Sequence, residues 1–201
     1  EAMEMGDFIQ ATGTLCVTQR RAQRLLIKHC NILTKASSPL PDKWSGLTDD
    51  DERYRKRYLD ILMNPELREI FEKKAKFFNT ARQFMIDEGF LEIETPTLES
   101  TTGGAEARPF ITHHNDFDID VYLRISVGEL WQKRALAAGF PRVFEIGRVY
   151  RNEGTSPEHL QEFTNMEFYC AYMDFIEGRK MVERMMKHVI EKTFNKLKFD
   201  I

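Results

Sequence analysis

The sequence predicts an α+β fold in which an antiparallel sheet is flanked by helices. β-like runs occur in pairs joined by polar segments, at 7–18 with 24–35 and at 143–151 with 163–172. Runs with apolar residues at steps of three and four, typical of amphipathic helices, occupy 65–88 and 175–197. The chain has 201 residues, of which 42% are hydrophobic, so it allows one domain or two small ones.

The first pair of runs predicts a β-hairpin whose turn is the polar segment 19–23. Two strands alone are marginally stable, so this hairpin needs further packing partners. Residues 36–48 contain Pro39, Pro41 and Gly46, and this composition predicts a linker.

A long helix is expected to begin at Asn64 and to end before Gly89. Asparagine is a good N-cap, the following Pro65 suits the first helical position, and glycine suits the residue after a helix. The next run, 90–98, is a strand that contains Pro96. Proline cannot donate to a ladder, so this strand should lie at a sheet edge or end at the proline.

Two more helices are predicted from capping-box pairs. Ser126 and Glu129 begin a helix over 126–138, after a strand at 119–125, and Gly139 stops it. Asp174 and Glu177 precede the C-terminal helix. The apolar face expected for that helix consists of Met181, Val182, Met185, Met186, Val189, Ile190, Phe194 and Leu197.

Composition narrows the class of protein. The net charge is −3, which excludes a polybasic nucleic-acid-binding tail as the main character of the chain, although not a local basic patch. No apolar run is long enough for a membrane span, and no secretory signal is visible. The scattered Cys16, Cys30 and Cys170 argue against a disulfide framework and favour a cytoplasmic protein. His113-His114 has no partner at zinc-ligand spacing, so no metal site is expected.

The segment 144–172 carries the chemistry. Alternation along its second strand places Phe163, Glu167 and Tyr169 on one face, together with Asn165 and Ala171, opposite an apolar face. Arg151, Glu153 and His159 lie at the end of the preceding strand and in the loop, above this face. Such a group suits a nucleotide phosphate with an amino group beside it.

These residues resemble motif 2 of the class II aminoacyl-tRNA synthetases, in the lysyl branch. The motif is Arg151-Asn152-Glu153-Gly154, then His159, Glu162-Phe163-Thr164 and Met166-Glu167-Phe168-Tyr169. Motif 1 resembles 84–98, and the segments 108–114 and 121–125 match the lysyl branch. Upstream, GDFIQATGTL, PLPDKWSGL and RYRKRYLDILMNPE resemble the end of an anticodon-binding OB barrel and its junction to the catalytic domain.

The resemblance implies a domain plan. Residues 1–36 would be the last strands of the OB-fold domain, 37–64 a linker or hinge, and 65–201 the first half of the class II catalytic domain with its antiparallel sheet. Motif 1, with Pro96, implies a homodimer interface. The basic cluster at 53–57 is either a solvated helix face or a tRNA contact.

The resemblance also implies how ATP would bind. Arg151 would be the catalytic residue, because it would hold both the α-phosphate of ATP and the carboxylate of the amino acid. Glu153 would hold the adenine and the loop, His159 would reach the distal phosphates, and Phe163 would stack on adenine.

Lysine would bind beside the nucleotide. Gly104 and Glu129 would receive its α-ammonium group, and Glu167 with Tyr169 would face its ε-ammonium group. For Glu129 the alternative is a purely structural capping role. Mg²⁺ ligands are expected mainly in the C-terminal half of the catalytic domain, since no motif 3 occurs in this sequence. We therefore expect the chain by itself not to activate lysine.

The leading interpretation is a lysine–tRNA ligase that forms lysyl-adenylate from lysine and ATP and transfers lysine to tRNA(Lys). Aspartyl- and asparaginyl-tRNA synthetases are alternatives, but their pockets must receive a carboxylate or an amide, whereas two acids occur here. A paralogue that lysylates a protein is a second alternative. A non-catalytic dimerisation or RNA-binding module is a third.

Overall fold

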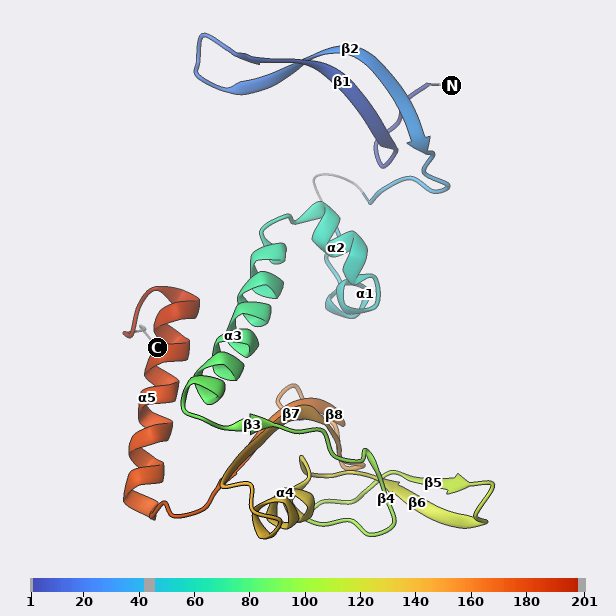
Figure 1. The fold of residues 1–201 in the computed structure, drawn as a ribbon. Helices are drawn as coiled ribbons and strands as arrows, with labels where there is room; N and C mark the ends of the chain where they lie inside the picture. Colours follow the sequence, from blue (N-terminus) through green and yellow to red (C-terminus); the bar gives the residue numbers. More distant parts are fainter. Residues whose placement is uncertain (1, 42–45, 199–201) are drawn as a thin grey trace. The chain divides into compact units, whose positions relative to one another are not determined.

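The structure, a computed structural model, describes residues 2–41 and 46–198. It consists of two compact units, Glu1–Phe71 and Glu72–Ile201, which are described separately below (Figure 1). Helices and mainly antiparallel strands make up the described chain, so the predicted α+β class is confirmed. The domain limits at 36 and 64 stay predictions.

The first unit begins with an antiparallel hairpin. Strands β1 (Phe8–Val17) and β2 (Gln23–Thr34) pair with Thr12 opposite His29, within one residue of the predicted limits at each end. Their side chains are mostly exposed, as at Leu15, which is 80% exposed. The described residues form no closed barrel, and membership of an OB domain stays a prediction.

Two short helices follow the predicted linker, of which residues 42–45 lie outside the described residues. Helix α1 (Asp50–Arg55) is capped by Asp49, and α2 (Arg57–Met63) ends at Asn64. The buried Asp60 carboxylate accepts from Asn64 Nδ2 at 3.0 Å and Arg53 Nε at 3.2 Å, and it also contacts Arg57. Burial raises the pKa of Asp60, but the hydrogen bonds from Asn64 and Arg53 outweigh it and hold this pKa below its usual value.

Helix α3 (Leu67–Asp87) begins later than predicted, and the N-cap role expected for Asn64 is wrong. The Asn64 carbonyl accepts from Leu67 N–H and the Pro65 carbonyl accepts from Arg68 N–H, so a tight i,i+3 turn precedes the helix. The predicted end is confirmed, because Gly89 follows the helix with a φ of +82°.

The second unit contains two small sheets (Figure 1). In one, β3 (Leu91–Glu92), β7 (Arg142–Tyr150) and β8 (Glu162–Cys170) lie in the order β3-β7-β8, and β3 pairs in parallel with β7. The other has the order β4-β6-β5, from β4 (Leu98–Glu99), β6 (Ile119–Leu123) and β5 (Ile111–His114). The predicted strand 90–98 is therefore interrupted around Pro96 and lies at an edge, as expected.

The core forms where α3 and α5 (Phe175–Phe194) pack on one face of the β7-β8 pair. Phe144 and Phe168 are opposite each other in the ladder and belong to this face, and the Phe168 ring meets Phe90 edge-on at 5.7 Å. The alternation of β8 is therefore confirmed: its even-numbered residues face the core, and its odd-numbered residues are on the other face.

Helix α5 has the predicted capping box between Asp174 and Glu177. Only part of its expected apolar face is buried: Met181, Met185 and Val189 are in the core, whereas Val182 and Met186 are exposed. The expected stripe was too wide, because a helix packed on one sheet face buries only the residues on the contact side.

Helix α4 (Glu129–Ala137) corrects another prediction. Its N-cap is Gly128, in a left-handed conformation with φ 63°, so the predicted Ser126–Glu129 capping box is wrong. The Ser126 hydroxyl instead donates to the Gly103 carbonyl at 2.8 Å. The predicted end of α4 is confirmed, since Gly139 follows the helix with a φ of +101°.

Candidate active site

Residues of the loop after β7, with Phe163 of β8, line a partly open cavity of about 300 Å³. The four residues predicted to bind ATP all line it. The lining consists of Arg151, Glu153, Gly154, Glu158, His159, Leu160, Gln161 and Phe163. The volume is at the lower end of the range of ligand pockets, and the cavity combines an aromatic ring with cationic and acidic groups.

Arg151, which lines this cavity, is held in place by contacts with the backbone. Its N–H donates to the Gln161 carbonyl at 2.8 Å, and its guanidinium approaches the Ile125 carbonyl at 3.4 Å. The guanidinium carbon also lies 5.2 Å from the centre of the Phe163 ring. A cation and an aromatic face thus meet at one place, which suits a phosphate next to a planar base.

Glu153 ties the loop to another part of the chain. Its Oε1 accepts from the Arg108 N–H at 3.3 Å, and the Asn152 N–H donates to the Arg108 carbonyl at 2.7 Å. Arg108 is the first residue of the segment 108–114, which resembles the lysyl branch in sequence. Its backbone therefore holds the loop after β7 at Asn152 and Glu153.

The odd-numbered face of β8 carries an acidic group. Glu167 Oε1 accepts from Val127 N–H at 3.0 Å and from Asn165 Nδ2 at 3.3 Å, and Oε2 lies 3.5 Å from the Tyr169 hydroxyl. Burial, and then the nearby charges of Glu167 and Glu129, raise the pKa of Tyr169 to about 12. Tyr169 is therefore a neutral hydroxyl beside carboxylates.

Gly104 and Glu129 lie together, as the sequence interpretation requires. Gly104 has a φ of +86°, and a Cβ there would come within 2.8 Å of Glu129 Oε2 and 2.1 Å of Ser126 Oγ. Glu129 Oε1 is 2.5 Å from Lys133 Nζ, and this ammonium is 5.9 Å from the centre of the Tyr169 ring. The ammonium group of Lys133 thus already contacts Glu129, one of the two acids.

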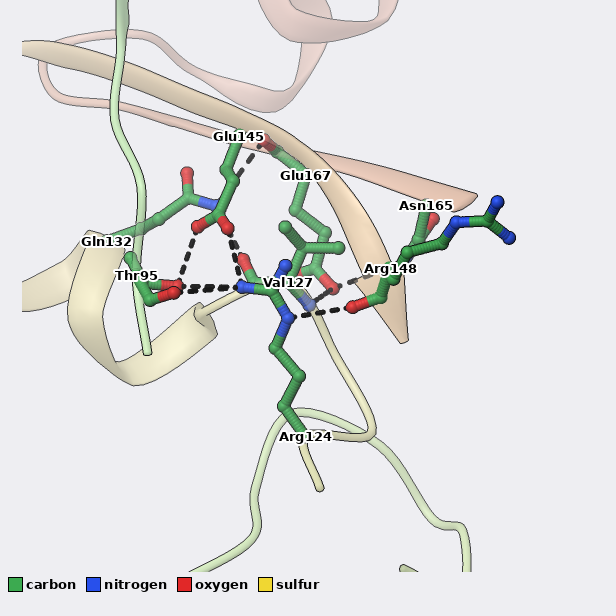
Figure 2. A network of polar contacts seen from close by, with 8 residues as sticks. All are labelled: Thr95, Arg124, Val127, Gln132, Glu145, Arg148, Asn165 and Glu167. Carbon is green, nitrogen blue, oxygen red and sulfur yellow. Dashed lines mark hydrogen bonds and ion pairs between the residues drawn. The ribbon is translucent and has the colours of Figure 1, made fainter. Parts of the chain in front are cut away.

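A buried charge network on this same face was not found from the sequence (Figure 2). Arg124 Nη1 lies 2.5 Å from Glu145 Oε1, and the Thr95 hydroxyl donates to Glu145 Oε2 at 2.6 Å. Arg124 Nε also donates to the Arg148 carbonyl at 2.8 Å. The signal that would have found it is a single glutamate inside the apolar strand VFEIG.

The register explains what this network does for the site. Glu145 is directly opposite Glu167 in the β7-β8 ladder. Like charges at opposite positions destabilise a sheet. Arg124 balances the charge of Glu145, whereas the donors that contact the Glu167 carboxylate are neutral.

Residue 127 is fixed from both sides (Figure 2). Its N–H binds Glu167, and its carbonyl accepts from the fully buried Gln132 Nε2 at 2.8 Å. The next residue, Gly128, packs so closely that a Cβ would lie 2.2 Å from Thr95 Oγ1. The segment before α4 is thus fixed in the position that orients Glu167.

Pro96, the residue predicted at a dimer interface, lies between β3 and β4. With Leu98, Glu99 and Trp131 it helps to line a second cavity, of about 250 Å³. Burial raises the pKa of Glu99. Participation of Pro96 in a dimer stays a prediction.

Three other features bear on the sequence interpretation. Each of the four basic residues in the cluster at 53–57 pairs with a carboxylate of α1 or α2. The pairs are Arg53–Asp60, Arg55–Asp51, Lys56–Glu52 and Arg57–Asp60. Over residues 2–41 and 46–198, the structure has no group of three or more His, Cys, Asp or Glu side chains placed to hold a metal ion. None of the described helices is both long and apolar enough to cross a bilayer.

Comparisons with known proteins agree with the motifs. Residues 49–200 match the family described as class II tRNA synthetases (D, K and N). The lysine–tRNA ligase of Roseiflexus sp. (strain RS-1) is 49% identical over 181 residues, which is 90% of this chain and 37% of that protein. The lysine–tRNA ligase of Prochlorococcus marinus (strain MIT 9301) is 45% identical over 190 residues, 94% of this chain and 37% of that protein.

Proposed function

The chain belongs to the class II tRNA synthetases of the aspartyl, lysyl and asparaginyl group, and from that premise we propose that it supplies the ATP- and lysine-binding residues of a lysine–tRNA ligase. It spans 37% of the length of the lysine–tRNA ligases that it resembles. The observation that carries the proposal is the acidic group formed by Glu129, at the start of α4, and Glu167 with Tyr169, on β8. Phe163 near the start of β8 lines the Arg151 cavity.

In the proposed reaction, a carboxylate oxygen of lysine attacks the α-phosphorus of ATP. A bond forms between these atoms, the bond from the α-phosphorus to the bridging oxygen breaks, and pyrophosphate leaves. Arg151 binds both anions, so it aligns them and balances the charge that develops at the α-phosphate. A 3′-terminal ribose hydroxyl of tRNA(Lys) then attacks the lysyl carbonyl carbon, and AMP leaves.

The other residues act by binding. Phe163 stacks on the adenine, Glu153 holds the adenine and the loop, and His159 donates to the distal phosphates. Glu129, beside Gly104, receives the α-ammonium group of lysine, and Glu167 receives the ε-ammonium group. The described residues do not form a ligand set for Mg²⁺, so no step is assigned to that ion.

The partners follow from the same assignment. We expect lysine, ATP and tRNA(Lys) as substrates, a homodimer formed through the segment around Pro96, and a cytoplasmic location. An aspartyl or asparaginyl enzyme would need a cationic or amide group where Glu129 and Glu167 lie, so the acidic group favours lysine.

The test replaces the matching segment of the Roseiflexus sp. ligase with residues of this chain and measures ATP–pyrophosphate exchange with lysine, aspartate or asparagine. Exchange should depend on lysine alone. Arg151→Ala should lower it by at least about a hundredfold, because a charge-stabilising group is lost. Arg148→Ala is the matched control, since Arg148 is three residues earlier, on β7, but is exposed and paired with Glu162.

The lysine pocket has its own variant pair. Glu167→Gln should raise the KM for lysine about tenfold or more, because a hydrogen bond to a charged group is worth about 1.5–3 kcal/mol. Glu162→Gln, an exposed change on the same strand, should not. Exchange that prefers aspartate, or that survives Arg151→Ala, would refute the assignment. The same assay on the 201-residue chain tests the expectation that it is near background by itself.

A further inference from the structure

The loop that lines the proposed nucleotide cavity contains a small hairpin of its own. Ser156 and His159 form an isolated antiparallel bridge, in which the His159 N–H donates to the Ser156 carbonyl at 3.1 Å. Pro157 and Glu158 make the turn between them. The bridge fixes the backbone of His159, and therefore the position from which its side chain extends. His159 lines the cavity.

The side chains of this hairpin are also joined. Ser156 Oγ lies 2.7 Å from His159 Nδ1, and the same oxygen accepts from the Glu158 N–H at 3.2 Å. A hydroxyl has one proton to donate and two lone pairs. Because the Glu158 N–H already donates to the oxygen and polarises it, the hydroxyl proton is well placed to go to Nδ1.

We propose that Ser156 is a positioning residue that fixes the tautomer of His159, with the ring proton on Nε2 and directed to the cavity. The identity of the ligand rests on the function proposed above. When Nδ1 accepts from Ser156, a neutral imidazole must carry its proton on Nε2. The edge of the ring away from Ser156 is then a donor.

This arrangement suits a ligand whose oxygens only accept. Phosphate oxygens have no proton to donate when ionised, so a neutral histidine whose Nδ1 is occupied by Ser156 can donate to them only in the Nε2–H form. When the ring is protonated, the serine hydroxyl can rotate and accept from Nδ1–H, and Nε2–H is unchanged. The other charged groups that line the cavity are Arg151, Glu153 and Glu158.

Long-range ¹H–¹⁵N spectra of the histidine rings in the 201-residue chain test the tautomer directly. They are recorded without nucleotide at about pH 8, where imidazoles are mostly neutral. The chain has five histidines, so His159→Gln identifies the signal. We expect Nε2–H in the unchanged chain, a mixture in Ser156→Ala, and recovery in Ser156→Thr. Ser156→Asp should move the proton to Nδ1, because a carboxylate only accepts.

Thr155→Ala is the matched control, since it removes a neighbouring exposed hydroxyl from the same loop. A His159 ring that is protonated on Nδ1 in the unchanged chain, or a spectrum that Ser156→Ala leaves unaltered, would overturn the inference. Neither result depends on whether the chain binds ATP.

A second measurement separates this inference from the proposed function. In the Roseiflexus chimera, Ser156→Ala should weaken ATP binding by about two- to tenfold, the cost of ordering one freed side chain. In a His159→Ala background the same change should have no further effect, because the ring is absent. If the spectra agree but ATP affinity is unchanged, the tautomer is fixed as proposed and the phosphate role of His159 fails.

Discussion

Removing Arg124 should destabilise the chain strongly, because its side chain balances a buried carboxylate. The Arg124 and Glu145 side chains are each 5% exposed and lie 2.5 Å apart. We choose Arg124→Met, which keeps much of the volume and removes the charge. Breaking a buried pair by removing one partner typically costs about 3–5 kcal/mol, since the other charge stays buried. The perturbation is larger here because Glu145 faces Glu167 across the ladder.

Removing both charges should restore much of that loss. Replacement of a buried pair by apolar residues is often close to neutral. In this network, however, Thr95 Oγ1 and the Arg148 carbonyl also lose a donor. An unsatisfied buried polar group costs about 1–3 kcal/mol. We therefore expect Arg124→Met with Glu145→Met to recover about 2 kcal/mol relative to Arg124→Met alone.

Urea unfolding followed by circular dichroism measures the two single variants and the double variant, which together give the coupling energy. The exposed Arg148–Glu162 pair is the matched control, because it also involves a residue of β7, which it joins to β8 at 3.4 Å. Its removal should cost less than about 1 kcal/mol. A double variant as unstable as Arg124→Met alone would show that the two charges are not coupled, and the assigned role of Arg124 would be wrong.

Three further predictions concern pH and the lysine pocket. Burial and the charges of Glu167 and Glu129 raise the pKa of Tyr169 from 10.0 to about 12, so its contribution to stability is complete below pH 10 and is lost as the pH rises towards 12. Absorbance titration of the six tyrosines should lose its last phase in Tyr169→Phe, and a phase that persists would contradict the assignment. Hydrogen bonds from the Ala36 and Glu4 N–H groups and from Lys35 lower the pKa of Asp7 from 3.8 to about 2. Its stabilisation of the first unit is therefore present above about pH 4 and is lost as the pH falls towards 2. Asp7→Asn should flatten the acid transition of the hairpin signals in NMR spectra, and an unchanged transition would exclude Asp7 as its cause. Gly104→Ala should raise the KM for lysine in the chimera, because the new Cβ meets Ser126 and Glu129, whereas Gly89→Ala, at a similar φ of +82° but in open space, should change only stability. Equal KM values in the two variants would remove Gly104 from the pocket.

The sequence predicted the elements well where local signals suffice. The β7-β8 pair and α5 with its capping box follow from alternation, helical spacing and an Asp174–Glu177 pair, all of which act over a few residues. The failures occurred where a local signal competes with tertiary contacts. Ser126 has the spacing of a cap, but its hydroxyl is used by the Gly103 carbonyl, which is distant in sequence.

The residues of the candidate site also fall into two sets, those that the sequence predicted and those that it missed. The four residues proposed to bind ATP could be predicted because they belong to one continuous motif, and the structure places all four around one cavity. Arg124 and Thr95 were missed, because they contact the site through partners that are far away in sequence. Gln132 was missed because nothing in its helix shows that its amide is buried against the Val127 carbonyl. A buried arginine cannot be told from an exposed one until its strand neighbours are known.

The pairing of charges on this face gives a physical reason for a cationic ligand. Glu145 has a permanent cation in Arg124, and Glu129 has a half-exposed one in Lys133, whose side chain is 55% exposed. The contacts of Glu167 come instead from neutral donors, the Val127 N–H, the Asn165 amide and the Tyr169 hydroxyl. Neutral hydrogen bonds fix the orientation of a carboxylate without cancelling its charge. In the proposed pocket, an incoming ammonium group would therefore meet an oriented negative charge at Glu167, whereas a side-chain carboxylate would meet repulsion at the same place.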